Sequence, residues 1–236
     1  MNDDASKTAR SLGGELAGRV EHVGPHVADD VALLGRLPAA HRSLLERLNG
    51  FSVQKGALRV FGLRDEPYLD LEQWNDDGLW KYAWSKPLEA WLMIAQNAFG
   101  SQYAYRLDGP DGDIGGPIYY LDPIELGEAP LFDDVDAFIE ECVVRMADAV
   151  FDPELKAAVE RYGPVDPSEL LVFSPAEALG GLRDLDNVQH LPAVTAMTFS
   201  GDIYRQIDEH PDADPTEVRP VKDDAGRDRL ELVYPP

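Results

Sequence analysis

The chain has 236 residues, 44% of them hydrophobic, and it carries 44 acidic against 21 basic residues, a formal net charge of −23 at pH 7. This length suffices for one large domain or two small ones, and no stretch approaches the roughly 20 apolar residues of a membrane span. The negative charge excludes nucleic acid and membrane surfaces as partners, because polyanions and anionic lipids would be repelled. Two interpretations stay open: acidity that keeps the protein in solution, or an acidic surface that attracts a basic partner.

The start of the sequence and its cysteine content indicate the cellular compartment. Residues 1–20 lack the apolar middle of a secretory signal, and the single cysteine, Cys142, cannot form an internal disulfide. We therefore expect a cytoplasmic protein. The weak patterning of residues 1–25 predicts a loose N-terminal arm or a short helix.

A helix and then a series of strands are predicted from residue 37 onward. Pro38 is typical of a first helical turn, and Asn49-Gly50 is a stop signal after three leucines that share one face. Alternating apolar and polar residues then predict four strands, at Leu58–Leu63, Trp91–Ala95, Gln102–Leu107 and Ile118–Leu121. The glycine- and aspartate-rich stretch between the last two strands predicts a hairpin loop.

Three helices are predicted in the second half of the chain, at Asp134–Val150, Pro153–Tyr162 and about Leu191–Ile207. The first is the strongest, because Asp133 or Asp134 can cap it and its apolar residues recur at the helical period. Cys142 lies on that apolar face, where a thiol packs as a small hydrophobic group.

The order of these elements predicts an α+β fold. An antiparallel sheet is expected to pack against the helices at Ala39–Leu48 and Asp134–Val150, with a helical C-terminal extension. Residues 26–208 are expected to form a single domain, since no repeat or long linker divides them. Residues 209–236 are predicted to form an acidic tail with a possible small hairpin, Glu217–Val221 and Leu230–Tyr234, turned by Asp223–Gly226.

No catalytic residue, cofactor or metal ligand set is predicted. His22 and His26 stand four residues apart but lack the further ligands of a zinc site. Asp108, Asp111 and Asp113 superficially resemble a calcium loop, yet no glutamate closes it, and a hairpin turn explains the composition. Neither a nucleophile elbow nor a phosphate-binding glycine loop is present, so the chain is not expected to be an enzyme.

One aromatic and acidic segment rises above this background. It contains Trp74, Trp80 and Trp84 together with Tyr82 and the pair Asp76-Asp77. Tryptophan and tyrosine are typical interface anchors, and the acidic neighbours would favour a basic partner. The alternative interpretation is that the rings fold inward and cover the sheet.

Two parts of the sequence resemble known families. Residues 37–50, Leu-Pro-Ala-Ala-His-Arg-Ser-Leu-Leu-Glu-Arg-Leu-Asn-Gly, resemble the opening of the SUKH superfamily, in which such a helix precedes an antiparallel sheet. Residues 94–123, the helix around Phe138 and the stretch Phe173–Gly181 resemble type VI secretion DNase-immunity proteins, which pair this region with a GAD-related one. The similarity spans roughly Leu37 to Ile207.

The resemblance includes departures from the family pattern. Glu177 stands where an apolar residue is expected, Leu171-Val172 replace an aromatic-glycine pair, and Pro192 interrupts the helix that follows. The matching residues are turn glycines and apolar core residues, so the family brings no catalytic residues to this chain.

The resemblance implies an immunity protein that binds a cognate toxin and blocks it. Nuclease toxins need a basic cleft for their substrate, so an acidic inhibitor would complement them. The partner expected is therefore a basic, nuclease-like protein toxin, bound without catalysis through Trp74, Asp76, Asp77, Trp80, Tyr82 and Trp84. A non-catalytic regulatory or scaffold adaptor of the same fold is the alternative, followed by an enzyme or small-molecule binder.

Overall fold

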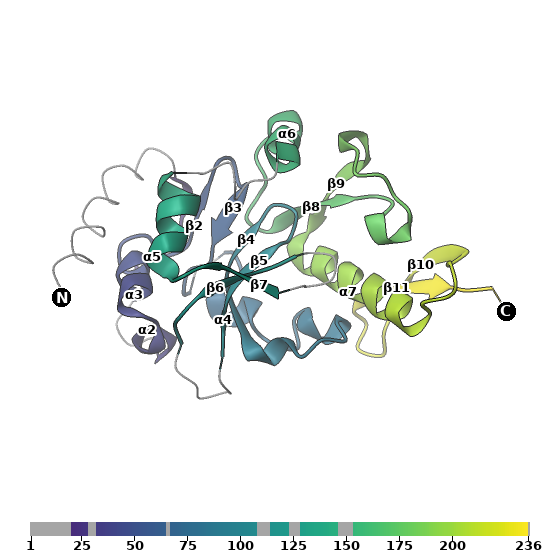
Figure 1. The fold of residues 1–236 in the computed structure, drawn as a ribbon, viewed down its shortest axis with the longest axis horizontal. Helices are drawn as coiled ribbons and strands as arrows, with labels where there is room; N and C mark the ends of the chain where they lie inside the picture. The colour runs from purple at the N-terminus through teal and green to yellow at the C-terminus, as the bar shows by residue number, and fades with distance from the viewer. Residues whose placement is uncertain are drawn as a thin grey trace.

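The computed structural model describes residues 20–27, 32–64, 67–107, 114–122, 128–145 and 153–235. It confirms the α+β class: a seven-stranded antiparallel sheet is accompanied by helices and followed by two separate two-stranded sheets (Figure 1).

The large sheet is a meander in which each strand pairs antiparallel with the next along the chain. Its strands are β1 (Val20–Val23), β2 (Phe51–Val53), β3 (Leu58–Val60), β4 (Trp91–Asn97), β5 (Gln102–Arg106), β6 (Ile118–Leu121) and β7 (Glu128–Phe132). All four strands predicted from the sequence are present, and all seven residues of β4 are buried at the centre. At the outer edge of the sheet, β7 contains Pro130. Edge strands tolerate proline because the backbone N–H that proline lacks has no neighbouring strand to bond on the outer side.

Strand β1 corrects the predicted N-terminal boundary. Val20–Val23 pairs with β2 and therefore belongs to the sheet, although it falls within the stretch predicted as a loose arm. Long-range pairing overrides the weak local pattern of these residues. Residues 1–19 lie outside the described part of the chain.

One face of the sheet packs against α2 (Ala32–Arg36), α3 (Ala39–Leu45) and α5 (Val135–Phe138), as the sequence predicts for the last two. The ring of Tyr103 contacts that of Phe138, and the hydroxyl of Tyr105 lies 3.4 Å from Nδ1 of His41. His41 is fully buried on α3, and this burial lowers its pKa to about 4.

Helix α5 begins as expected and then changes its winding. The Asp134 carboxylate accepts a hydrogen bond from the backbone N–H of Ala137 (2.8 Å), and π-helical turns continue the helix over Ile139–Val144. Cys142 is fully buried there, as predicted, and burial raises its pKa. Residues 146–150 of the predicted helix lie outside the described residues.

A row of polar side chains crosses the opposite face of the sheet. The strand register aligns Ser52, Arg59, Gln96 and Gln102 on β2 to β5. The guanidinium of Arg59 donates to the carbonyls of Leu69 and Pro167, at 2.6 Å each. Arg59 thus joins the sheet to the segments that cover it, and so does Gln102, whose side-chain oxygen accepts a hydrogen bond from the indole of Trp74 (2.9 Å).

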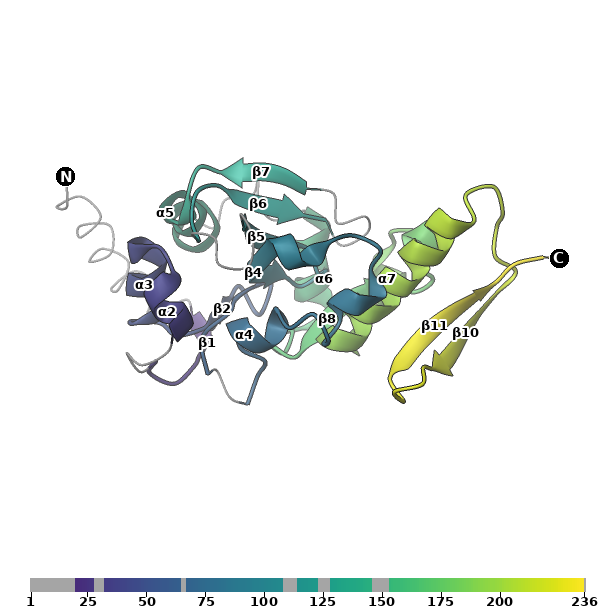
Figure 2. The same cartoon turned by 90° about the horizontal axis from the view of Figure 1, so that it is seen from below.

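The elements that cover this face come from the connection between β3 and β4 and from the end of the chain. They are α4 (Leu71–Trp74), α6 (Pro153–Tyr162), β8 (Glu169–Phe173), β9 (Val188–Pro192), α7 (Ala193–Glu209), β10 (Glu217–Lys222) and β11 (Asp228–Val233). In Figure 2 the β10–β11 hairpin lies along α7 at the C-terminal end of the molecule. The hairpin and α6 are confirmed, whereas α4 and the β8–β9 hairpin are not among the predicted elements.

Pro192 has a different role from the one expected. The sequence suggests that it interrupts a helix, but it is the N-cap residue of α7, which begins at Ala193. A proline at a helix start costs little, since the first backbone N–H groups of a helix have no partner within it.

Candidate partner-binding surface

The three tryptophans of the predicted binding segment lie in the core. Trp74 and Trp80 are fully buried, and Trp84 is nearly so. The rings of Phe61, Trp74 and Trp80 pack in series, with centroids 5.2 and 5.4 Å apart. The sequence-based hypothesis that these tryptophans contact a partner is therefore wrong; the inward-folding alternative holds.

Each indole N–H of this segment has a partner within the chain, as burial requires. Trp74 donates to the side-chain oxygen of Gln102 (2.9 Å), and Trp80 donates to the carbonyl of Trp74 (3.0 Å). Trp84 donates to the carbonyl of Met197 on α7 (3.0 Å). The tryptophans thus fix the segment on the sheet and join it to α7.

Tyr82 also makes its contacts within the chain. Its half-buried ring lies under the guanidinium groups of Arg227 and Arg229, whose central carbons are 3.6 and 5.0 Å from the ring centroid. Both arginines belong to the C-terminal hairpin. Cation–π contacts of this kind contribute about 0.5–1 kcal/mol at exposed sites, so Tyr82 helps to hold the hairpin rather than offering a free ring.

The acidic residues of the segment have the opposite orientation. Asp76, Asp77 and Glu89 are exposed, and the charges of all three act on Lys81. We call these three carboxylates the acidic loop surface. One exposed lysine, Lys86, stands within the same stretch.

Lys81 lies beneath the acidic loop surface with little exposure. Its ammonium nitrogen is 3.7 Å from the Asp77 carboxylate and 3.4 Å from the carbonyls of Leu88 and Trp91. Burial lowers the pKa of Lys81, and the nearby carboxylates of Asp77 and Glu89 oppose that shift. The Lys81 ammonium group therefore lies within the fold, and the exposed side of this segment is mainly acidic.

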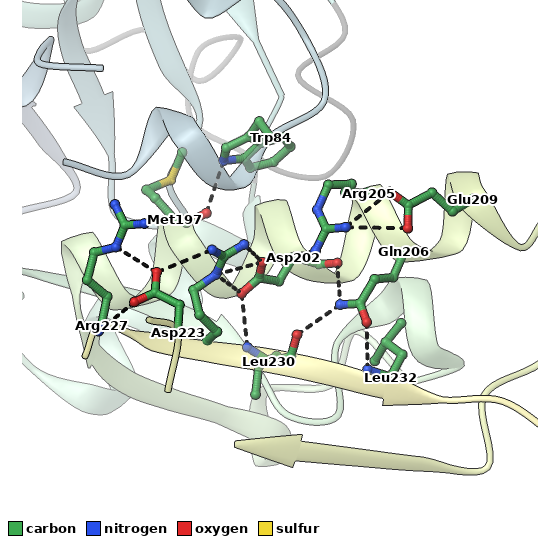
Figure 3. A network of polar contacts seen from close by, with 11 residues as sticks. Trp84, Met197, Asp202, Arg205, Gln206, Glu209, Asp223, Arg227, Leu230 and Leu232 are labelled. Carbon is green, nitrogen blue, oxygen red and sulfur yellow. Dashed lines mark hydrogen bonds and ion pairs between the residues drawn. The ribbon is translucent and has the colours of Figure 1, made fainter. Parts of the chain in front are cut away.

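A polar network joins α7 to the hairpin (Figure 3). The fully buried carboxylate of Asp202 accepts hydrogen bonds from the Arg229 guanidinium, at 2.9 and 3.0 Å from Nε, and from the backbone N–H of Leu230 (2.9 Å). One turn later, the Gln206 amide donates to the carbonyl of Leu230 (2.8 Å) and accepts from the N–H of Leu232 (2.9 Å). Two side chains of α7 thus replace a neighbouring strand along the inner edge of β11.

The free edge of the hairpin is poorly suited to recruit another strand. The backbone groups of Leu230 point toward α7, so its cross-strand partner Pro220 directs its own backbone to the outside of β10. Proline has no N–H to donate at that place, which weakens the edge as a template for strand addition.

Two cavities differ greatly in size. The larger measures about 110 Å³ and has apolar walls formed by Phe99, Leu171, Val172, Phe173 and Ala176. The smaller, beside Gln96 and Arg59, measures about 10 Å³, which suits nothing larger than one water molecule. Only the larger cavity could accept part of a ligand.

Among the described residues, no group of three or more His, Cys, Asp or Glu side chains could hold a metal ion. His22 packs edge-on against Tyr68, and His26 is exposed. Asp108, Asp111 and Asp113 lie outside the described residues. Within the same limits, no helix has the length and apolar character needed to span a bilayer.

Comparison with known proteins supports the fold and leaves function open. No protein-family model and no curated protein matches the chain. The crystal structure of Atu4351 from Agrobacterium tumefaciens is similar, with a TM-score of 0.54 and 11% sequence identity, over 90% of this chain and 93% of that chain. At this identity the likeness shows a common fold alone.

Proposed function

We propose that this chain is a cytoplasmic immunity-type protein that binds a basic, nuclease-like toxin and occludes its active surface without catalysis. The observation that carries the proposal is the acidic loop surface, which stands on a rigid base of buried tryptophans. The resemblance of residues 37–207 to immunity families and the net charge of −23 support the same reading.

A rigid base matters for binding through charge. Flexible acidic side chains lose conformational entropy when they are ordered by a partner, whereas a fixed loop loses less. Asp76 is held in place because its carboxylate accepts a hydrogen bond from the N–H of Gly78 (2.7 Å), and Asp77 is held by Lys81. Complementary potentials then speed association and select basic partners.

Co-expression with the product of the neighbouring reading frame tests the proposal. If that product is a toxin, the parent protein should restore growth and form a complex with it. Replacing Asp76 and Asp77 with asparagine should slow association and flatten its dependence on salt, because long-range attraction is screened by ions.

A matched control separates position from total charge. Asp212 and Asp214 are exposed carboxylates on the connection between α7 and β10, so replacing both with asparagine changes the net charge equally. The proposal requires the first pair to have the larger effect on association, with both variants melting near the parent. Equal effects would place the interface elsewhere on the acidic surface. A parent protein that binds no toxin would favour the adaptor alternative.

A further inference from the structure

The cavity of about 110 Å³ lies where three parts of the chain meet. Its walls come from the turn after β4, from β8 with the segment that follows it, and from α7, which contributes Ser200. We propose that this pocket is a docking site for one aliphatic side chain of a protein partner, of leucine or methionine size, with a basic residue next to it.

The size and lining of the pocket select the occupant. A cavity of about 150 Å³ lined by apolar side chains can bind benzene, whereas a water molecule occupies about 30 Å³. A pocket between these limits suits one branched or flexible aliphatic side chain. Apolar walls formed by Leu171, Val172 and Phe173 reward burial of such a side chain, as anchor pockets at protein interfaces do.

The pocket is formed in advance by its backbone supports. Phe99 and Phe173 stack with centroids 5.1 Å apart, and the N–H of Leu171 donates to the carbonyl of Ala98 (2.7 Å). At Gly181 a Cβ atom would lie 2.0 Å from the carbonyl oxygen of Pro175, so this turn is packed backbone against backbone. A partner therefore meets a preformed wall, which lowers the entropic cost of binding.

The charged groups at the rim of the pocket favour a particular residue next to the docked side chain in the partner. Arg183 lies 2.8 Å from the Glu154 carboxylate and 3.7 Å from that of Glu177, so one cation serves two carboxylates. Glu177 is the more distant of the two carboxylates, and it lines the pocket with its side chain partly exposed. Leu182, the residue before Arg183, has 72% of its surface exposed. A lysine or arginine next to the docked side chain would complement this rim.

Short peptides test the pocket without any toxin. The probes are acetylated, amidated pentapeptides with the central sequences Lys-Leu-Lys, Lys-Ala-Lys and Glu-Leu-Glu, titrated into the isotope-labelled full chain. We expect Lys-Leu-Lys to shift the amide NMR signals of Phe99, Phe173 and Ser200. Lys-Ala-Lys should bind at least about tenfold more weakly, because alanine lacks the methyl groups that leucine would bury in the pocket. Glu-Leu-Glu should bind several-fold more weakly.

Filled-pocket variants supply the decisive comparison. Ala176→Leu and Ser200→Leu each add bulk to the pocket, and Ala225→Leu adds it to an exposed turn of the hairpin as a control. Either pocket variant that melts near the parent should lose at least tenfold in affinity for Lys-Leu-Lys, and the control should lose none. Glu177→Gln should reduce the difference in affinity between Lys-Leu-Lys and Glu-Leu-Glu. Binding without preference for leucine, unchanged binding by the filled variants, or no binding would overturn the proposal.

The claim that the docked side chain belongs to the basic surface of a toxin rests on the proposed function. The expected selectivity among the three peptides does not depend on that function. Loss of peptide binding with intact protection would refute the pocket alone. Selective peptide binding by a protein that neutralises no toxin would refute the immunity function alone.

Discussion

The indole ring of Trp84 occupies the space that a side chain at position 201 would need. A Cβ atom on Gly201 would lie 2.7 Å from both Cδ1 and Nε1 of Trp84, closer than real Cβ atoms approach other atoms. The same indole donates to the carbonyl of Met197, one turn earlier on α7. The segment that covers the sheet and the C-terminal helix therefore meet at this ring, and a glycine allows the approach.

Gly201→Ala should lower the free energy of unfolding by about 1–3 kcal/mol, because overpacking forces the ring or the helix to move. Gly35 is the matched control. It is also glycine in a helix, but its Cβ would meet nothing within 4 Å. Gly35→Ala should be neutral or stabilise by up to about 1 kcal/mol through helix propensity. Denaturant unfolding measures both, and equal stability of the two variants would contradict the close contact.

Asp202→Asn should loosen the C-terminal hairpin. The substitution removes the buried negative charge that pairs with Arg229 and weakens its charge-assisted hydrogen bonds, at a cost of about 1.5–3 kcal/mol. Hydrogen exchange at the amides of Leu230 and Leu232 should accelerate, since these amides lie at the docked edge of β11. Asp208→Asn, at an exposed site on the same helix, should leave exchange unchanged. Unaltered protection in the first variant would show that Gln206 and apolar contacts hold the hairpin without the ion pair.

His41 should make stability depend on pH in the mildly acidic range. In the folded protein its pKa is about 4, whereas an unfolded chain binds a proton near pH 6.5. The unfolded state thus binds more protons in this window, so stability is constant above pH 6.5 and falls as the pH drops toward 4. The total loss is about 3 kcal/mol, at about 1.4 kcal/mol per pH unit.

The test of this pH dependence compares slopes between pH 5 and 6.5, above the ordinary titration range of carboxylates. His41→Gln keeps a group that can bond to the Tyr105 hydroxyl but removes the titration, so its unfolding free energy should change less across this window. His210→Gln replaces an exposed histidine and should retain the parent slope. Parallel slopes for the parent and His41→Gln would exclude His41 as the cause.

Trp80→Ala should reduce stability rather than affinity. Its ring is fully buried against that of Trp74, so truncation creates a cavity that costs about 3–5 kcal/mol. At a temperature where the variant remains folded, its dissociation from a bound partner should match that of the parent. Faster dissociation with unchanged unfolding would mean that the ring contacts the partner after all.

Local sequence patterns were sufficient to predict the elements whose signals lie within a few residues. The alternation at Gln102–Leu107, the cap at Asp134 and the turn at Asp223–Gly226 each specify their own structure, since pleat, capping and turn geometry are short-range properties. The α+β class follows from the order of those elements. The strands β1, β2, β7, β8 and β9 were missed because they are short or weakly alternating, and they form only by pairing with other strands.

Tertiary structure alone decided which way the residues of the candidate site face. Tryptophan anchors interfaces and cores with the same apolar surface, so no pattern in residues 74–84 could tell a buried ring from an exposed one. Asp202 looks from its sequence like any solvated carboxylate on a helix. It is buried because Arg229, 27 residues further along the chain, folds back onto it. Burial and charge pairing depend on what the rest of the chain brings alongside, and that information is absent from any local window.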